Sequence, residues 1–148
     1  SDEFPEMRRQ AIKLSRFAKN IYVKIPITNT RAESCISLIE DLLKEKVKIN
    51  VTAVMTLGQI EELSGALASK IPVIVSVFAG RIADTGMDPI GFMKKAKSIL
   101  SGFKNVELLW ASPRELLNIF HAEEAGVRYY YGTARDIKEN TSGKLRFT

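Results

Sequence analysis

The amino-acid sequence predicts an α/β protein built on a parallel β-sheet. Short apolar segments of strand length alternate along the chain with longer segments in which apolar residues recur every three or four positions. This alternation is typical of βαβ crossovers, which join parallel strands. The 148 residues are 45% hydrophobic and 26% charged, a composition typical of one globular domain and unlike that of disordered or fibrous proteins.

The strands and helices can be assigned in chain order. We expect strands over residues 21–28, 49–54, 73–77 and 106–111, because these segments are short and apolar. A first helix is expected over residues 3–19, with Pro5 in the first turn, where a missing N–H costs nothing. The other helices are expected where apolar residues have helical spacing: Ala32, Ile36, Ile39 and Leu43; Ile60, Leu63 and Leu67; Phe92, Ala96, Ile99 and Leu100; and Leu116, Leu117 and Phe120, with Pro113 as the opening residue.

Two sheet architectures fit this order: an open doubly wound sheet, and part of an eight-stranded barrel, which normally needs about 200 residues or more. No glycine-rich phosphate-binding motif follows a strand, which disfavours the dinucleotide-binding version of the open sheet. Alternate residues of the four strands gather polar side chains near the C-terminal ends: Tyr22, Lys24, Pro26 and Thr28; Asn50, Thr52 and Val54; Ser76 and Phe78; Trp110, Ser112 and Arg114. Singly these could be hydrogen-bonded fillers of a layered core, but the repeated pattern favours one site at the mouth of a barrel.

Lys24 is the main indication of chemistry. It lies in the middle of the apolar run IYVKIPIT at residues 21–28. An ammonium removed from water there must be paired or lose its proton, and a neutral amine can attack a carbonyl carbon to form a Schiff base. The alternative is a structural lysine whose amine reaches solvent or a carboxylate at the strand end.

Several classes of protein are disfavoured. The longest apolar stretch, residues 71–80, is too short to span a bilayer, and the first residues lack the pattern of a signal peptide, so we expect a cytoplasmic protein without membrane contact. The net charge is +5, but residues 127–148 hold five basic and two acidic residues, which leaves +2 and no basic stripe for nucleic acid on the rest of the chain. The single Cys35 falls on an apolar helix face and is expected in the core.

Four motifs together resemble the transaldolase and fructose-6-phosphate aldolase family. They are VKIPIT at residues 23–28, INVTAV at 49–54, SVFAGRI at 76–82 and ASPR at 111–114. The resemblance covers residues 1 to about 126. It implies the C-terminal part of a (β/α)8 TIM barrel, from the helix before barrel strand 4 through the helix after strand 7, with barrel strand 8 expected in the residues that follow.

The resemblance also implies roles for single residues. Lys24 would form the Schiff base with a ketose phosphate; Asn50 and Thr52 would contact the dihydroxyacetone part or order the catalytic water; Ser76 would line the site; Arg81, Ser112 and Arg114 would bind the phosphate. Phe78 favours a transaldolase, which passes the three-carbon unit to an aldose acceptor, over a fructose-6-phosphate aldolase, which releases it. The implied partners are phosphorylated sugars and, for the full-length protein, further copies of itself; no cofactor and no metal ion are expected.

The first departure from the family concerns acid–base catalysis. The aspartate and glutamate that transfer protons lie on barrel strands 1 to 3, which the resemblance does not cover. Asp84 and Asp88 follow Arg81 and are expected on a loop, solvated or capping a helix. Proton transfer contributes roughly 10² to 10⁴ in rate, so we expect this chain alone to be a poor catalyst. A non-catalytic, phosphosugar-binding half barrel is the alternative, and the missing initial methionine fits a truncated reading frame.

The second departure is the segment from residue 127 to 148. The family has a strand of the type DIITV there, followed by a helix. With a permissible choice of codons, residues 128–145 read one base later encode DIITVPREILKKIQAVN, so we hypothesise an out-of-frame translation of strand 8 and its helix; sequencing the source DNA tests this. A weaker alternative takes Tyr129 to Tyr131 and the basic tail as a surface that stacks single-stranded nucleic acid.

Overall fold

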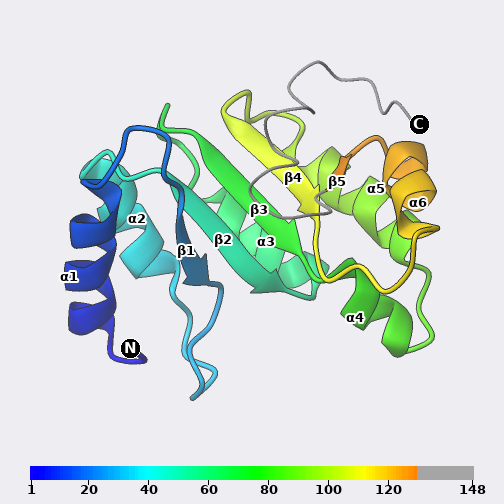
Figure 1. Ribbon diagram of the computed structural model, residues 1–148, viewed down its shortest axis with the longest axis horizontal. Helices are drawn as coiled ribbons and strands as arrows, with labels where there is room; N and C mark the ends of the chain where they lie inside the picture. Colours follow the sequence, from blue (N-terminus) through cyan, green and yellow to red (C-terminus); the bar gives the residue numbers. More distant parts are fainter. Residues whose placement is uncertain (130–148) are drawn as a thin grey trace.

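The computed structural model describes residues 1–129 of the chain. A sheet of five parallel strands runs through the molecule in the order β1-β2-β3-β4-β5 (Figure 1). The strands are β1 (Val23–Pro26), β2 (Ile49–Val54), β3 (Val73–Val77), β4 (Val106–Trp110) and β5 (Arg128–Tyr129). Spatial order therefore equals sequence order. A doubly wound sheet reverses its order at a switch point, so this sheet matches an arc of a barrel instead.

Six helices accompany the strands within residues 1–129. They are α1 (Phe4–Ser15), α2 (Ile36–Lys44), α3 (Leu57–Ser64), α4 (Ala79–Asp84), α5 (Pro89–Leu100) and α6 (Asn118–Ala125). Parallel crossovers of one hand between neighbouring strands leave their helices on the same face of the sheet. The apolar core lies between that face and the helices. None of the helices in residues 1–129 combines the length and apolarity that crossing a membrane requires.

The core lies between the helices and one side of every long strand. The strand residues that face the helices are Val23 and Ile25; Ile49 and Val51; Val73, Val75 and Val77; Leu108 and Trp110, all buried. The side chains between them, among them Lys24, Asn50 and Ile74, lie on the opposite side, here called the open face. This alternation is the reason that a period of two can be read from β2 and β3.

The predicted bounds of β2 and β3 are confirmed, and Cys35 is confirmed as a core residue with no exposed surface. The expected helix through Ala32 begins later, at Ile36. The side-chain oxygen of Asn29 accepts hydrogen bonds from the backbone N–H groups of Arg31 and Glu33 at 3.0 and 2.9 Å, so the chain turns there instead of starting a helix.

The expected helix opening at Pro113 is wrong in its start. α6 begins at Asn118, and Leu116, Leu117 and Phe120 are 61%, 51% and 51% exposed, so they are not its packed face. The helix α4, of six residues, has no counterpart among the helices that the sequence predicts. Such a helix is too short to show a hydrophobic period.

Residues 130–148 lie outside the described part. The proposed division at residue 126 and the reading-frame hypothesis for residues 128–148 therefore stay predictions. Within the described part, the chain pairs again after α6, with Arg128 opposite Leu109 and Tyr129 opposite Trp110 in parallel register.

Candidate active site

The first part of the site is a row of polar residues across three strands of the open face. Lys24 on β1 lies opposite Asn50 on β2, and Pro26 lies opposite Thr52. The hydroxyl of Ser76 on β3 donates a 2.7 Å hydrogen bond to Oδ1 of Asn50. Asn50 is paired in register with Ile74, so Ser76 lies two residues farther along β3, and its hydrogen bond makes Lys24, Asn50 and Ser76 one row that runs obliquely across the three strands. The structure thus brings together three residues that the sequence analysis assigned to one site.

The bond from Ser76 fixes one end of the Asn50 amide. Ser76 is 2% exposed, so its hydroxyl has little access to competing water. Since Oδ1 of Asn50 accepts this bond, the two N–H groups of the amide remain available as donors. No other side-chain hydrogen bond of Asn50 occurs within residues 1–129. The row can therefore offer a ligand oxygen an amide donor beside the Lys24 amine.

A β-bulge shapes the end of β2. The pairing of β2 with β3 shifts between Val51 and Val54, and Ala53 adopts a positive φ of 61°. The carbonyl of Thr52 accepts a bond from Ile27 N–H at 2.9 Å, which ties the bulge to β1. Bulges of this kind turn a strand end and change the direction of its side chains. Thr52 is partly exposed on the open face, as a residue that contacts a ligand must be.

Lys24 differs from expectation in one respect. It is exposed, and not withdrawn from water as the apolar run predicts. It makes no hydrogen bond or ion pair within residues 1–129, so its amine is free there. The difference arises because the flanking Val23 and Ile25 face the helices while Lys24 faces the open side, which no helix or strand of the described residues covers.

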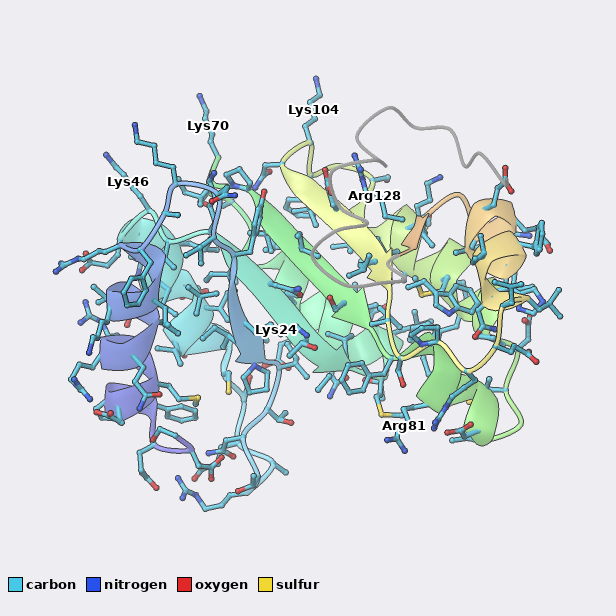
Figure 2. The ribbon with its side chains drawn as sticks, in the orientation of Figure 1. Lys24, Lys46, Lys70, Arg81, Lys104 and Arg128 are labelled. Atoms are coloured by element: carbon cyan, nitrogen blue, oxygen red, sulfur yellow. The ribbon has the colours of Figure 1, made fainter. Side chains whose placement is uncertain are left out.

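The second part of the site lies beyond the C-terminal ends of the strands. Figure 2 shows Arg81 at this end, whereas Lys46, Lys70 and Lys104 lie at the other end of the sheet. Arg81 is exposed on α4 and has no ion-pair partner among residues 1–129. Its guanidinium is therefore available to an anion.

Arg114 comes from the loop between β4 and α6, which packs directly on α4. A Cβ atom on Gly80 would lie 1.8 Å from the carbonyl oxygen of Ser112, so only glycine allows this contact. Ser112 itself has a positive φ of 57°. The contact places Arg81, the residue after Gly80, near the loop of Ser112 and Arg114.

Two side chains fix Arg114 from opposite ends. Its backbone N–H donates to Oδ1 of Asn118 at 2.8 Å, and its Nη2 forms an ion pair with Oδ2 of Asp84. Asp84 is the last residue of α4, so its expected position on a loop is wrong; its carboxylate is exposed, as expected, and has Arg114 as its ionic partner. The expectation of a capping role is confirmed for Asp88, whose carboxylate accepts bonds from the N–H groups of Ile90 and Gly91 at the start of α5.

Trp110 does not belong to the site. It pairs with Val77, which faces the helices, and its ring lies 6.0 Å from the ring of His121 on α6, measured between centroids. Counting alternate residues backwards from Ser112 and Arg114 gave the wrong side, because the backbone leaves the strand after Trp110. Phe78 follows β3 as the residue before α4; it is partly buried, and its N–H donates to the carbonyl of Val54 at 2.9 Å.

Two other kinds of reactive site, a cysteine nucleophile and a metal centre, have no support among residues 1–129. Burial raises the pKa of the Cys35 thiol, which favours the protonated, unreactive form. Among residues 1–129, no group of three or more His, Cys, Asp or Glu side chains is placed to hold a metal ion.

Comparison with known proteins agrees with this arrangement. The family model "Transaldolase/Fructose-6-phosphate aldolase" matches residues 1–134. "Probable transaldolase 2" of Listeria monocytogenes is 32% identical over 126 residues, which cover 84% of this chain and 54% of that protein. "Probable transaldolase" of Thermoanaerobacter sp. is 32% identical over 127 residues, covering 85% and 55%. "Probable transaldolase" of Dehalococcoides mccartyi is 36% identical over 123 residues, covering 82% and 53%.

The matched relatives are longer than this chain. The chain spans about half the length of the curated relatives it matches, 54% of the Listeria protein and 53% of the Dehalococcoides protein. A parallel sheet in sequence order, a lysine on its open face and arginines at the C-terminal ends of the strands fit one arc of a barrel enzyme. The chain belongs to the transaldolase/fructose-6-phosphate aldolase family.

Proposed function

We propose that this chain carries the Schiff-base and phosphate-binding part of a transaldolase-type site. The observation that carries the proposal is the row of Lys24, Asn50 and Ser76, with Lys24 opposite Asn50 and Ser76 bonded to Asn50. An amine that is to attack a ketone needs neighbouring donors that hold the sugar hydroxyls. Thr52, on the same face, completes this group.

In this proposal the Lys24 amine attacks the ketone carbon of a ketose phosphate. Addition gives a carbinolamine, loss of water gives an iminium, and the iminium accepts the electron pair of the C3–C4 bond as that bond breaks. The aldose phosphate leaves, and a three-carbon enamine stays on Lys24. Addition of an aldehyde acceptor to that enamine and hydrolysis of the new iminium complete the transfer of a dihydroxyacetone unit.

Arg81, Ser112 and Arg114 are proposed to bind the phosphate of donor and acceptor. Guanidinium groups suit a phosphate dianion because they offer several N–H donors in a fixed plane. Phosphate binding far from the reacting carbon holds the carbonyl near Lys24, which lowers the entropic part of the barrier. Loss of either arginine should raise the Kd for a ketose phosphate about tenfold or more, since each removes a charge-assisted hydrogen bond.

We favour transfer of the three-carbon unit to an aldehyde acceptor over its release from Lys24 by hydrolysis. Phe78 lies two residues after Ser76, between β3 and α4, and its ring offers no hydroxyl to hold a water molecule that would hydrolyse the intermediate. We place the reaction in cytoplasmic sugar phosphate metabolism of the pentose phosphate type, and we expect the full-length protein to form homo-oligomers. The general acid and base would come from barrel strands 1 to 3, which the family resemblance of this chain does not cover, so this chain alone should be nearly inactive in turnover.

Borohydride trapping followed by intact-protein mass spectrometry tests the proposal. Incubation with fructose 6-phosphate and reduction should leave a covalent adduct on the wild-type chain and on Lys70→Ala, whose lysine lies at the other end of the sheet (Figure 2). Lys24→Ala should give none. An adduct of equal yield in Lys24→Ala would remove Lys24 from its role.

A second candidate is a phosphosugar-binding half barrel without catalysis. The exposure of Lys24 favours it, because removal from water in an apolar pocket is one way in which a lysine amine is activated as a nucleophile, and Lys24 is not removed from water. This candidate predicts reversible binding of fructose 6-phosphate with no trapped adduct. A trapped species with only the three-carbon unit would show that the C3–C4 bond was broken and would exclude it.

A further inference from the structure

We propose that Asp84 is a positioning residue that holds the guanidinium of Arg114 for phosphate binding. The inference rests on the proposed phosphate pocket and assigns a role to a carboxylate that the sequence analysis left solvated. Asp84 ends α4, and Arg114 lies in the loop after β4, so the ion pair joins segments 30 residues apart.

The contact leaves Arg114 able to bind an anion. Asp84 engages Nη2 only, and no hydrogen bond occupies Nε or Nη1 within residues 1–129. A guanidinium has five N–H donors in one plane, so the edge away from Asp84 can still receive two phosphate oxygens. The side chains of Arg114 and Asp84 are 45% and 47% exposed, which leaves this edge open to a ligand.

The backbone on both sides of the pair is fixed. Asn118, which is 6% exposed, accepts hydrogen bonds from the backbone N–H groups of Arg114 and Glu115 at 2.8 and 3.3 Å. On the other side, Gly80 lies against the carbonyl of Ser112, and a Cβ there would also come within 3.0 Å of Arg114 Cγ. The stem of Arg114 is therefore held along α4, and Asp84 holds its tip.

Arg81 provides the contrast. It stands on the same short helix, yet it has no ion-pair partner among residues 1–129. A free arginine loses side-chain entropy when it binds an anion, whereas one that is already held loses less. The pocket would thus combine one prearranged arginine with one mobile arginine, and the first would set the position of the phosphate.

The direction in which the Kd for phosphate changes when Asp84 is removed shows whether Asp84 positions Arg114 or is only a nearby negative charge. A carboxylate near a bound phosphate repels it, so if Asp84 were only a nearby charge, its removal would tighten phosphate binding. If Asp84 positions Arg114, its removal must weaken phosphate binding despite the lost repulsion. The two explanations predict opposite changes in Kd.

The test is isothermal titration calorimetry, in which the 148-residue chain is titrated with inorganic phosphate and the Kd is measured. Asp84→Ala should raise the Kd about 2- to 12-fold, the cost of ordering one long side chain. Asp84→Asn keeps an oxygen that can accept a bond from the guanidinium and should lie between wild type and Asp84→Ala. Asp88→Asn, which removes the same charge four residues away and keeps an α5 capping oxygen, should bind as wild type does.

Two comparisons make the result decisive. In an Arg114→Ala background, Asp84→Ala should cause no further loss. Unchanged or tighter binding by Asp84→Ala, together with weaker binding by Arg114→Ala, would overturn the role of Asp84 and leave the phosphate pocket standing. Equal Kd values for wild type and Arg114→Ala would overturn the pocket and this inference together.

Failure of the Schiff-base proposal is recognised separately. Treatment with dihydroxyacetone, which carries no phosphate, and then with borohydride tests Lys24 without the phosphate pocket, through the adduct that forms on the wild-type chain and not on Lys24→Ala. Absence of that adduct would reject the Schiff base, while the phosphate titrations would still decide the role of Asp84. Asp84→Asn serves if Asp84→Ala fails to fold, which circular dichroism would reveal.

Discussion

At the scale of single residues, the hydrogen bond between Ser76 and Asn50 is the best-defined polar contact of the open face. It joins a buried hydroxyl to an amide that lies opposite Lys24. Its removal would leave the Asn50 oxygen without its described partner and the amide free to rotate. The contact therefore contributes to stability and to the arrangement of the site at once.

Ser76→Ala should lower the free energy of unfolding by about 1 kcal/mol, the typical net value of one hydrogen bond. It should also reduce the yield of borohydride-trapped adduct, because the Asn50 amide loses its fixed orientation. Urea unfolding measures the first effect. Ser98→Ala, at an exposed helix position with no side-chain hydrogen bond in the described residues, is the matched control and should change stability by less than about 0.5 kcal/mol.

Gly80 offers a sharper test of the packing between α4 and the β4–α6 loop. In Gly80→Ala the new methyl group would meet the Ser112 carbonyl, so backbone must shift, and we expect a loss of about 1 to 3 kcal/mol in stability. Phosphate affinity should fall as well, since the shift moves Arg114. Gly58→Ala meets no atom within 4 Å and should be neutral or slightly stabilising; equal behaviour of the two variants in thermal melts would contradict the contact.

At the scale of elements, the sequence was informative wherever a strand or helix carries its own pattern. β2 alternates buried and partly exposed residues as far as its bulge, β3 is a short apolar segment, and Asp88 with Pro89 marks the start of α5. The start of α6 was missed because the side chain of Asn118 holds the preceding turn, and Pro113 alone carries no sign of that bond.

The part of the candidate site that lies on the strands could be predicted from the sequence, and the part that lies on the loops could not. Lys24, Asn50 and Ser76 could be placed on one face, because a period of two is a property of each strand alone. The Asp84–Arg114 pair and the side of Trp110 depend on how loops pack after the strands end. Such contacts are tertiary and leave no local pattern. The exposure of Lys24 depends on what covers the open face, which the strand itself does not determine.

The helix α1 provides a test by pH. Hydrogen bonds from Arg9 and Gln10 lower the pKa of Glu6 from 4.5 to about 2. The folded state thus binds this proton less readily than the unfolded state, so the contribution of Glu6 is present above pH 4.5 and is lost as the pH falls to about 2. The protection factors of the α1 amides, which correct the exchange rates for their intrinsic pH dependence, should fall over this window, and Glu6→Gln should remove that fall. An equal fall in Glu6→Gln would assign the change to other carboxylates.

At the scale of the whole molecule, the sheet has a long side that no other element of residues 1–129 covers, and an open edge among these residues. Within residues 1–129, β1 pairs only with β2, so its other edge has free N–H and C=O groups. Ile74 and Leu109 lie on the open face, partly exposed. Free edges and uncovered apolar side chains promote association between chains.

The purified 148-residue chain should therefore self-associate or unfold over a broad temperature range. Size-exclusion chromatography with light scattering, at several concentrations, measures the first property, and calorimetric melting measures the second. A monomer at all concentrations with a sharp, cooperative transition would contradict this prediction. It would mean that residues 130–148 protect the sheet, a role that deletion of these residues would then reveal.

The order of the strands has a consequence for folding during synthesis on the ribosome. Each strand joins the one made just before it, so no early strand must wait for a later one to insert between neighbours. Every emerging strand with its helix can dock on the edge left by its predecessor. Synthesis and folding can proceed in one direction at the same pace, and the edge that remains at any moment is the template for the next addition.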